Sequence, residues 1–181
     1  MGSPKALLPY RGKTFVEHLL DVTRHPRAGF TCVVLGANAT GIRKVLGNRV
    51  ANVVVNEEWQ KGQLSSIQAA IRSLPAETAG LVLCPVDHPM ISAALVAKLI
   101  EVFDSSGKSV ALPTFRGKRG HPVIFRSTLY HELLAASPEI GARQVVWAHA
   151  DDIAEVPAEE EGVILNVNDP EALKRAQAEK L

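Results

Sequence analysis

The run of residues 81–92 constrains the fold of this chain more than any other part of the sequence. Its first four residues are apolar and rich in branched side chains, which is typical of a strand buried on both faces. Asp87 follows between Pro85 and Pro89, which restrict the backbone on either side of it. Because ligands of open α/β sheets bind at the carboxyl ends of strands, this pattern predicts a metal or phosphate site at Asp87.

Asp87 also has a purely structural interpretation, since an aspartate commonly caps the turn or the helix that follows a strand. Ser92, however, is better placed to cap a helix that begins at Ala93. The Asp87 carboxylate is then left without a local structural role, which favours the functional interpretation.

Helices and strands are expected to alternate along the chain, and this alternation predicts a mostly parallel sheet with right-handed crossovers. A chain of 181 residues, 46% of them hydrophobic, can form one well-packed domain, so residues 1–181 are expected to be a single domain. The apolar spacing predicts helices at 14–25, 39–46, 62–74, 93–104, 128–136, 141–149 and beyond 170, and strands at 30–35, 50–55, 81–84, 109–113, 121–125, 153–156 and 163–167.

Charge and hydropathy exclude several classes of function. A formal net charge of +1, spread along the chain, gives no basic footprint for nucleic acid. The sequence contains no apolar run of about 18 residues, so no membrane span is expected. The two cysteines, Cys32 and Cys84, fall in predicted buried strands, which is typical of a reducing cytoplasm. Residues 1–5 have the composition of a loop, whereas an α/β domain usually begins with a strand. We therefore expect the first strand of the domain to be missing.

Two further segments carry polar groups at predicted element ends. Ser65 and Ser66 fall in the first turn of the helix at 62–74, where free N–H groups attract anions, although serine is also an ordinary helix starter. The basic turn at 116–120 precedes His121, and its three cations would attract a polyanionic substrate, although basic turns are usually solvated surface. Its two glycines predict a hairpin or a short antiparallel excursion.

Asn168 stands out near the carboxyl end of the chain. Asp169 and Pro170 have structural explanations, as the N-cap and first residue of the last helix. Asn168 has none, and it follows a predicted strand. Its amide oxygen is therefore available to a hard cation already held by Asp87.

These motifs, taken in order, resemble those of the MobA-like nucleotidyltransferases, and most closely the molybdenum cofactor cytidylyltransferases among them. The resemblance covers nearly the whole chain. It rests on Met1-Gly2-Ser3-Pro4-Lys5, Leu7-Leu8, Gly12-Lys13-Thr14, Trp59 with Gly62, Ser65-Ser66, Pro85-Val86-Asp87-His88-Pro89, Arg119-Gly120-His121-Pro122-Val123, Gly141-Ala142-Arg143 and Asn166-Val167-Asn168-Asp169-Pro170.

The resemblance implies a Rossmann-like, three-layer nucleotidyltransferase fold of the GT-A type with a mostly parallel mixed sheet. It implies an enzyme that moves NMP from an NTP to a phosphate acceptor and releases pyrophosphate, with Mg2+ as cofactor. The implied partners are an NTP, with CTP favoured over GTP, molybdopterin or the molybdenum cofactor as acceptor, and a molybdenum hydroxylase apoenzyme.

The same resemblance assigns roles to residues. Gly2 and Ser3 would belong to a glycine-rich phosphate loop, and Lys5 would neutralise charge on the triphosphate. Asp87 would be the principal Mg2+ ligand and Asn168 the second, so Lys5 and Asp87 are the expected catalytic residues.

The remaining assignments concern the two substrates. Ser65 and Ser66 would lie near the base or ribose of the nucleotide. The run from Arg119 through Gly120 to His121 would face the pterin acceptor, and Arg143 is a further candidate there.

The sequence departs from the family pattern in two places. The opening strand and the Leu-Ala-Ala-Gly start of the phosphate loop are absent, and because that strand lies in the middle of the family's sheet, a gap in the hydrogen-bond ladder is expected. The run at 166–170 also differs from the Asp-Ile-Asp-Thr-Pro common in the cytidylyltransferases. A guanylyltransferase, a transferase for another phosphorylated acceptor and a cofactor-binding accessory protein without turnover remain as alternatives.

Overall fold

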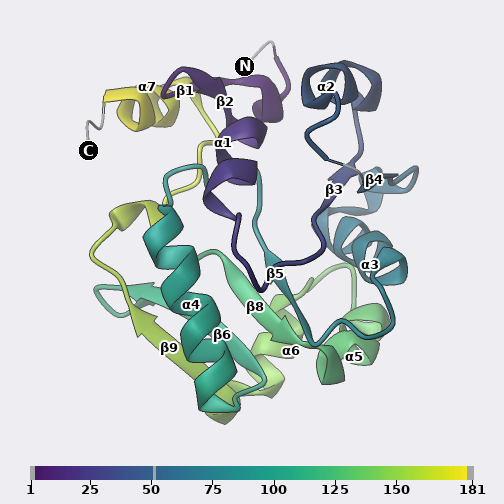
Figure 1. The fold of residues 1–181 in the computed structure, drawn as a ribbon, viewed down its shortest axis with the longest axis vertical. Helices are drawn as coiled ribbons and strands as arrows, with labels where there is room; N and C mark the ends of the chain where they lie inside the picture. The colour runs from purple at the N-terminus through teal and green to yellow at the C-terminus, as the bar shows by residue number, and fades with distance from the viewer. Residues whose placement is uncertain (1–2, 51, 179–181) are drawn as a thin grey trace.

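The computed structural model of the chain describes residues 3–50 and 52–178. Within them the strands form a hairpin, a separate parallel pair and a sheet of five strands (Figure 1). The hairpin is β1 (Pro9–Tyr10) with β2 (Lys13–Thr14), and the parallel pair is β3 (Cys32–Leu35) with β4 (Asn52–Val55). The larger sheet contains β5 (Gly80–Leu83), β6 (Val110–Phe115), β7 (Lys118–Arg119), β8 (Val123–Arg126) and β9 (Ile153–Pro157).

The helices lie close to the predicted positions, and the predicted caps Ser92 and Asp169 are present at the fourth and the last of them. Thr14 and Glu17 form a reciprocal capping box at the first helix, and the Ser92 hydroxyl accepts a hydrogen bond of 3.1 Å from Leu95 N at the fourth. The α-helices are α1 (Phe15–Val22), α2 (Ala39–Leu46), α3 (Gln63–Ser73), α4 (Ala93–Ser106), α5 (Tyr130–Ala135), α6 (Arg143–Ala148) and α7 (Pro170–Ala178). Short 3-10 turns are η1 (Lys5–Leu7), η2 (Trp59–Lys61), η3 (Ser127–Leu129), η4 (Ala150–Asp152) and η5 (Glu161–Val163).

The larger sheet is mixed because β7 and β8 run antiparallel to the strands they pair with. β8 is antiparallel to both β5 and β6, whereas β9 is parallel to β6, so β5, β6 and β9 share one direction. The reversal comes from the basic turn, where β6 continues through β7 into β8 as the predicted antiparallel excursion. The prediction of a mixed α/β sheet is confirmed.

Helices cover both faces of this sheet, which gives three layers. Alternate residues along a strand point to opposite faces, so Ala111 of β6 and Ile124 of β8 pack with α4, while Val110 and Phe125 pack with α3, α5 and α6. No helix among the described residues combines the length and the apolar character needed to cross a membrane.

The hydrogen-bond ladder is interrupted between the parallel pair β3–β4 and the larger mixed sheet. In the described part of the chain β3 pairs with β4 and β5 pairs with β8, but no bridge joins β3 to β5. All four residues of β5 are only partly buried, as expected for a strand with one open edge. The gap expected in the middle of the sheet is therefore present.

The strand predicted at 163–167 was wrong. The segment forms the end of η5 and an irregular stretch, although Val163 and Val167 are fully buried. Their backbone groups bond to loops instead of to a strand: Val163 O accepts from His121 N at 2.8 Å, and Val167 N donates to Asp87 O at 2.7 Å. The branched side chains at these positions reflect burial. Composition alone does not distinguish a buried irregular segment from a strand that pairs in a sheet.

Candidate functional site

The loop that follows β5 is bound tightly to the segment that precedes α7. The Glu160 carboxylate accepts hydrogen bonds from Ser92 N, at 3.0 Å, and from the Ser92 hydroxyl. Gly162 lies so close to this loop that a Cβ added to it would be 1.8 Å from Met90 O. Only glycine permits that approach, and the two segments are therefore held as one unit.

This packing places three of the predicted residues together. Because Val167 N donates to Asp87 O, the next residue, Asn168, is fixed beside the Asp87 turn. Lys5 Nζ donates to Asn168 Oδ1 and lies 3.6 Å from Asp87 Oδ2. The side chains of Lys5 and Asp87 remain 34% and 27% exposed, so a ligand can reach them. We refer to Lys5, Asp87 and Asn168 as the polar cluster.

The position of Lys5 is fixed by the residue that follows it. Ala6 is buried in an apolar cluster with Leu35, the last residue of β3, and with Val86, which precedes Asp87. The 3-10 turn η1 therefore bridges the carboxyl ends of β3 and β5. Lys5 is held at the edge of the sheet where ligands of α/β folds bind.

The donor atoms of the polar cluster suit a divalent cation. A carboxylate oxygen and an amide oxygen are hard ligands, the type that Mg2+ and Mn2+ prefer. The described residues contain no group of three or more His, Cys, Asp or Glu that could hold a metal alone. A cation at Asp87 and Asn168 would thus need further oxygens from water or a bound phosphate, and the Lys5 ammonium, which now contacts both side chains, would have to yield its place.

Two histidines lie next to the polar cluster. The rings of His88 and His121 have centroids 4.6 Å apart, and the Nδ1 atom of each is buried without a hydrogen-bond partner among the described residues. Burial lowers the pKa of both imidazoles, and together with His88 it lowers the pKa of His121 to about 4. The lowered pKa favours the neutral form of both rings. His88 was missed by the sequence reasoning, although it directly follows Asp87 in the proline-bracketed turn.

The backbone of the predicted acceptor run is fixed by close packing. A Cβ on Gly120 would lie 2.3 Å from Val163 O, so this position requires glycine. Arg119 is engaged elsewhere, because its Nε and Nη2 atoms both lie 2.8 Å from Glu155 Oε1 on β9. Of this run, His121 is the residue whose side chain reaches the neighbourhood of the polar cluster.

Arg143 is not brought to the polar cluster. Its Nε donates to Ile140 O at 2.7 Å, and its guanidinium lies 5.5 Å from the Trp147 ring centroid. It belongs to α6, which lies at the opposite end of the molecule from the N-terminal segment that carries Lys5 (Figure 1). Burial of Val145 against the sheet holds α6 there.

The predicted nucleotide-binding serines lie at the start of α3 and are tied to a buried amide. Asn56 is 6% exposed, and its Nδ2 donates to Ser65 Oγ at 2.8 Å and to Ser66 Oγ at 3.0 Å. The Ser65 hydroxyl in turn lies within 2.8 Å of Gly62 O. Ser3 is exposed two residues before Lys5, and Gly2 lies outside the described residues. The nucleotide-binding roles of these residues stay predictions.

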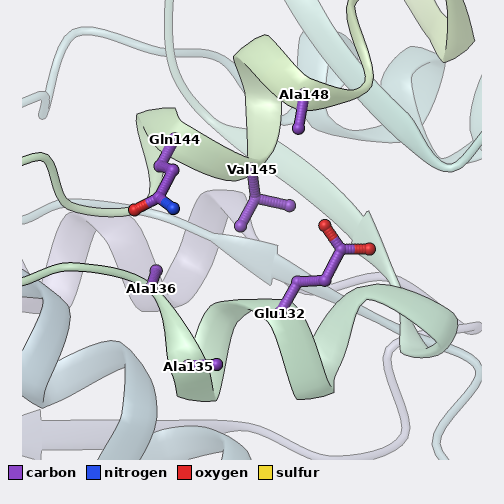
Figure 2. Close-up of a pocket in the computed structure, with 6 residues that line it drawn as sticks. All are labelled: Glu132, Ala135, Ala136, Gln144, Val145 and Ala148. Atoms are coloured by element: carbon purple, nitrogen blue, oxygen red, sulfur yellow. The ribbon is translucent and has the colours of Figure 1, made fainter.

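A cavity of about 170 Å3 lies between α5 and α6 (Figure 2). Its polar groups are few, and Glu132 is already paired with His149 Nε2 at 2.9 Å. None of the predicted site residues lines it. The lining residues are Glu132, Ala135, Ala136, Gln144, Val145 and Ala148.

The mixed sheet between two helical layers, with a lysine, a carboxylate and an amide at one edge, defines a three-layer α/β domain. Residues 1–153 match the model of the MobA-like NTP transferase domain. The chain therefore belongs to the MobA-like NTP transferase family, as its motifs predicted.

Three related proteins show how close the similarity is. The chain is 31% identical to nicotine blue oxidoreductase of Paenarthrobacter nicotinovorans over 77% of this chain and 71% of that one. It is 24% identical to molybdenum cofactor guanylyltransferase of Cupriavidus pinatubonensis over 98% and 89% of the two chains. Rv0371c of Mycobacterium tuberculosis H37Rv, solved in complex with manganese, superposes with a TM-score of 0.80 at 27% identity, covering 97% of this chain and 92% of that one.

Proposed function

We propose that this protein is a metal-dependent nucleotidyltransferase that transfers CMP from CTP to the terminal phosphate of molybdopterin or the molybdenum cofactor and releases pyrophosphate. The observation that carries this proposal is the polar cluster, in which Lys5, Asp87 and Asn168 meet at the carboxyl edge of the sheet. Family membership and the guanylyltransferase relative support the class of reaction and the pterin acceptor.

The chemistry suits these residue types. Acceptor phosphate and triphosphate are both anionic, so catalysis consists mainly of holding them in line and neutralising their charge. Asp87 and Asn168 would hold a divalent cation, Mg2+ or the manganese seen in a relative's structure, which supplies positive charge at the phosphates. Lys5 would bind the triphosphate oxygens. The attacking phosphate is already ionised, so no general base is assigned.

The acceptor would enter from the side of Gly120 and His121. The close contact of Gly120 with Val163 O fixes the backbone there, and the His121 ring is held against His88 beside Asp87. Neutral imidazoles can donate hydrogen bonds to a phosphate or a pterin without adding charge. A molybdenum hydroxylase apoenzyme would then receive the finished cofactor.

Three alternatives remain distinct from this proposal. The Asn168 form of the last motif and the guanylyltransferase relative favour GTP as donor. A cofactor-binding accessory protein without turnover is the second alternative. The relative named as an oxidoreductase favours a redox activity.

One assay separates these outcomes. The purified chain is incubated with Mg2+ or Mn2+, each NTP in turn and molybdopterin, and pyrophosphate release is followed. We expect release that depends on CTP, on the metal and on the acceptor. Release with GTP alone would make the protein a guanylyltransferase. Acceptor binding without release would favour an accessory protein. In a separate incubation, oxidation of NADH or NADPH coupled to reduction of a supplied dye as electron acceptor would favour the redox alternative.

A further inference from the structure

Trp59 is a large aromatic side chain that the fold holds in an exposed position. It is 43% exposed, yet the start of its side chain lies directly against Gly36, the residue after β3. A Cβ on Gly36 would be 2.6 Å from Trp59 Cβ and 2.9 Å from Cγ. The glycine is therefore needed for close approach, and the indole rests on a backbone floor while much of its ring stays accessible to solvent.

The turn that carries Trp59 is rigid. Asn56 N donates to Leu35 O at 2.7 Å, and the Asn56 side chain accepts from Glu58 N at 3.0 Å while it donates to Ser65 and Ser66. A fully satisfied buried amide thus ties residues 56–62 to β3 and to the start of α3. An exposed ring on so well fixed a turn can accept a ligand at little cost in conformational entropy.

This ring lies at the same edge of the sheet as the polar cluster. Ala6, Leu35 and Val86 pack in one apolar cluster. They are the chain neighbours of Lys5, Gly36 and Asp87 respectively. Gly36 beneath Trp59 and the two charged residues of the polar cluster therefore flank the same apolar cluster.

We propose that the Trp59 indole is the stacking platform for the base of the nucleoside triphosphate, whose phosphates extend to Lys5 and Asp87. This inference rests on the proposed function, since it takes an NTP as the substrate. Ser65 and Ser66 are the residues expected near the base or ribose. Both accept hydrogen bonds from the side chain of Asn56, which also fixes the turn that carries Trp59. The expected acceptor residues Gly120 and His121 instead pack against Val163 and His88.

Stacking on an indole is tolerant of base identity, because every base has a π face. The platform therefore supplies affinity for CTP and GTP alike, and the choice of base must come from hydrogen bonds elsewhere. Loss of one aromatic platform weakens nucleotide binding by roughly 5- to 100-fold.

The chain offers a matched fluorescence control, because its two tryptophans are Trp59 and Trp147, and Trp147 is 61% exposed on α6. The Trp147→Phe protein reports Trp59 alone, and the Trp59→Phe protein reports Trp147 alone. Titration with CTP or GTP and Mg2+, without acceptor, should give saturable quenching only in Trp147→Phe. Inorganic triphosphate should compete without quenching. Equal quenching in both proteins, or quenching by a free pterin but not by NTP, would overturn the platform.

Kinetics test the same point independently. Trp59→Ala should raise KM for the NTP roughly 5- to 100-fold while kcat changes less than about 3-fold. Trp59→Phe should restore most of the loss, and Trp147→Ala should change neither constant. Gly36→Ala, which displaces the ring, should resemble Trp59→Ala. Normal KM in Trp59→Ala with normal turnover refutes the platform, whereas specific quenching in a protein that never releases pyrophosphate refutes the proposed reaction and leaves the platform standing.

Discussion

The polar cluster and the cavity between α5 and α6 are built in opposite ways. The cavity has a volume of about 170 Å3 and lies between two short neighbouring helices (Figure 2). The one carboxylate that lines it, Glu132, is already paired with His149. The polar cluster is not enclosed, yet it joins Lys5 to Asn168, 163 positions apart, through a network of backbone contacts. We therefore expect the activity of this protein to depend on the converging polar groups and not on the cavity.

The largest effect expected from this comparison is on turnover. Asp87→Ala removes the expected principal metal ligand and should lower kcat for pyrophosphate release roughly 100- to 1,000-fold. Because Asp87 is a strand-end side chain with few partners, Tm should change by less than about 2 °C. Glu132→Gln, which removes the carboxylate of the cavity, is the matched control and should leave kcat unchanged. Near-normal activity in Asp87→Ala, or equal losses in both variants, would break the comparison.

The next effect is on stability. Gly162→Ala adds one carbon where Met90 O is 1.8 Å away, so the loop after β5 or the segment leading to Asn168 must shift. We expect a loss of about 2–4 kcal/mol and a fall in Tm of about 5–10 °C. Ala136→Val adds two carbons beside the cavity, where there is space, and should cost less than about 1 kcal/mol. Thermal unfolding of the two variants measures the difference, and a tolerant Gly162→Ala would show that the edge is less tightly fixed than its contacts indicate.

The smallest effect is the pH dependence of stability that the histidines near the polar cluster impose. Burial lowers the pKa of His18, His88 and His121, the last to about 4, from the ordinary value of 6.5. The unfolded chain therefore binds more protons below pH 6.5, so the stability that these groups contribute is complete above that pH and is lost as pH falls toward 4. Tm should drop by about 5 °C between pH 7 and pH 5. His121→Gln should flatten that slope, and a Tm that is constant over this range would contradict the burial of the rings.

Much of the fold could be predicted because its signals are local. The Thr14 capping box, the Ser92 cap and the antiparallel excursion at the basic turn depend on residues a few positions apart, and all three are present. The open ladder beside β5 was also expected. These features are encoded by hydrogen bonds and backbone angles that neighbouring residues satisfy among themselves.

Other features depended on contacts that no local pattern encodes. Val163 and Val167 were expected in a strand, but their partners are single loop groups. Arg143 was expected near the pterin acceptor because it matched a family motif, but it lies on α6, away from the polar cluster. Trp59 was noticed only as part of a motif, because the closeness of Gly36 to its ring is invisible in sequence.

The sequence by itself determined most of the order of helices and strands, the family, and the residues without a local structural role, Asp87 and Asn168 among them. Only the tertiary structure decided which of those residues meet, because meeting depends on distant backbone groups such as Val167 N and Asp87 O finding each other. The sequence specifies which residue carries the carboxylate, but the packing of segments far away in sequence sets the direction in which that carboxylate points.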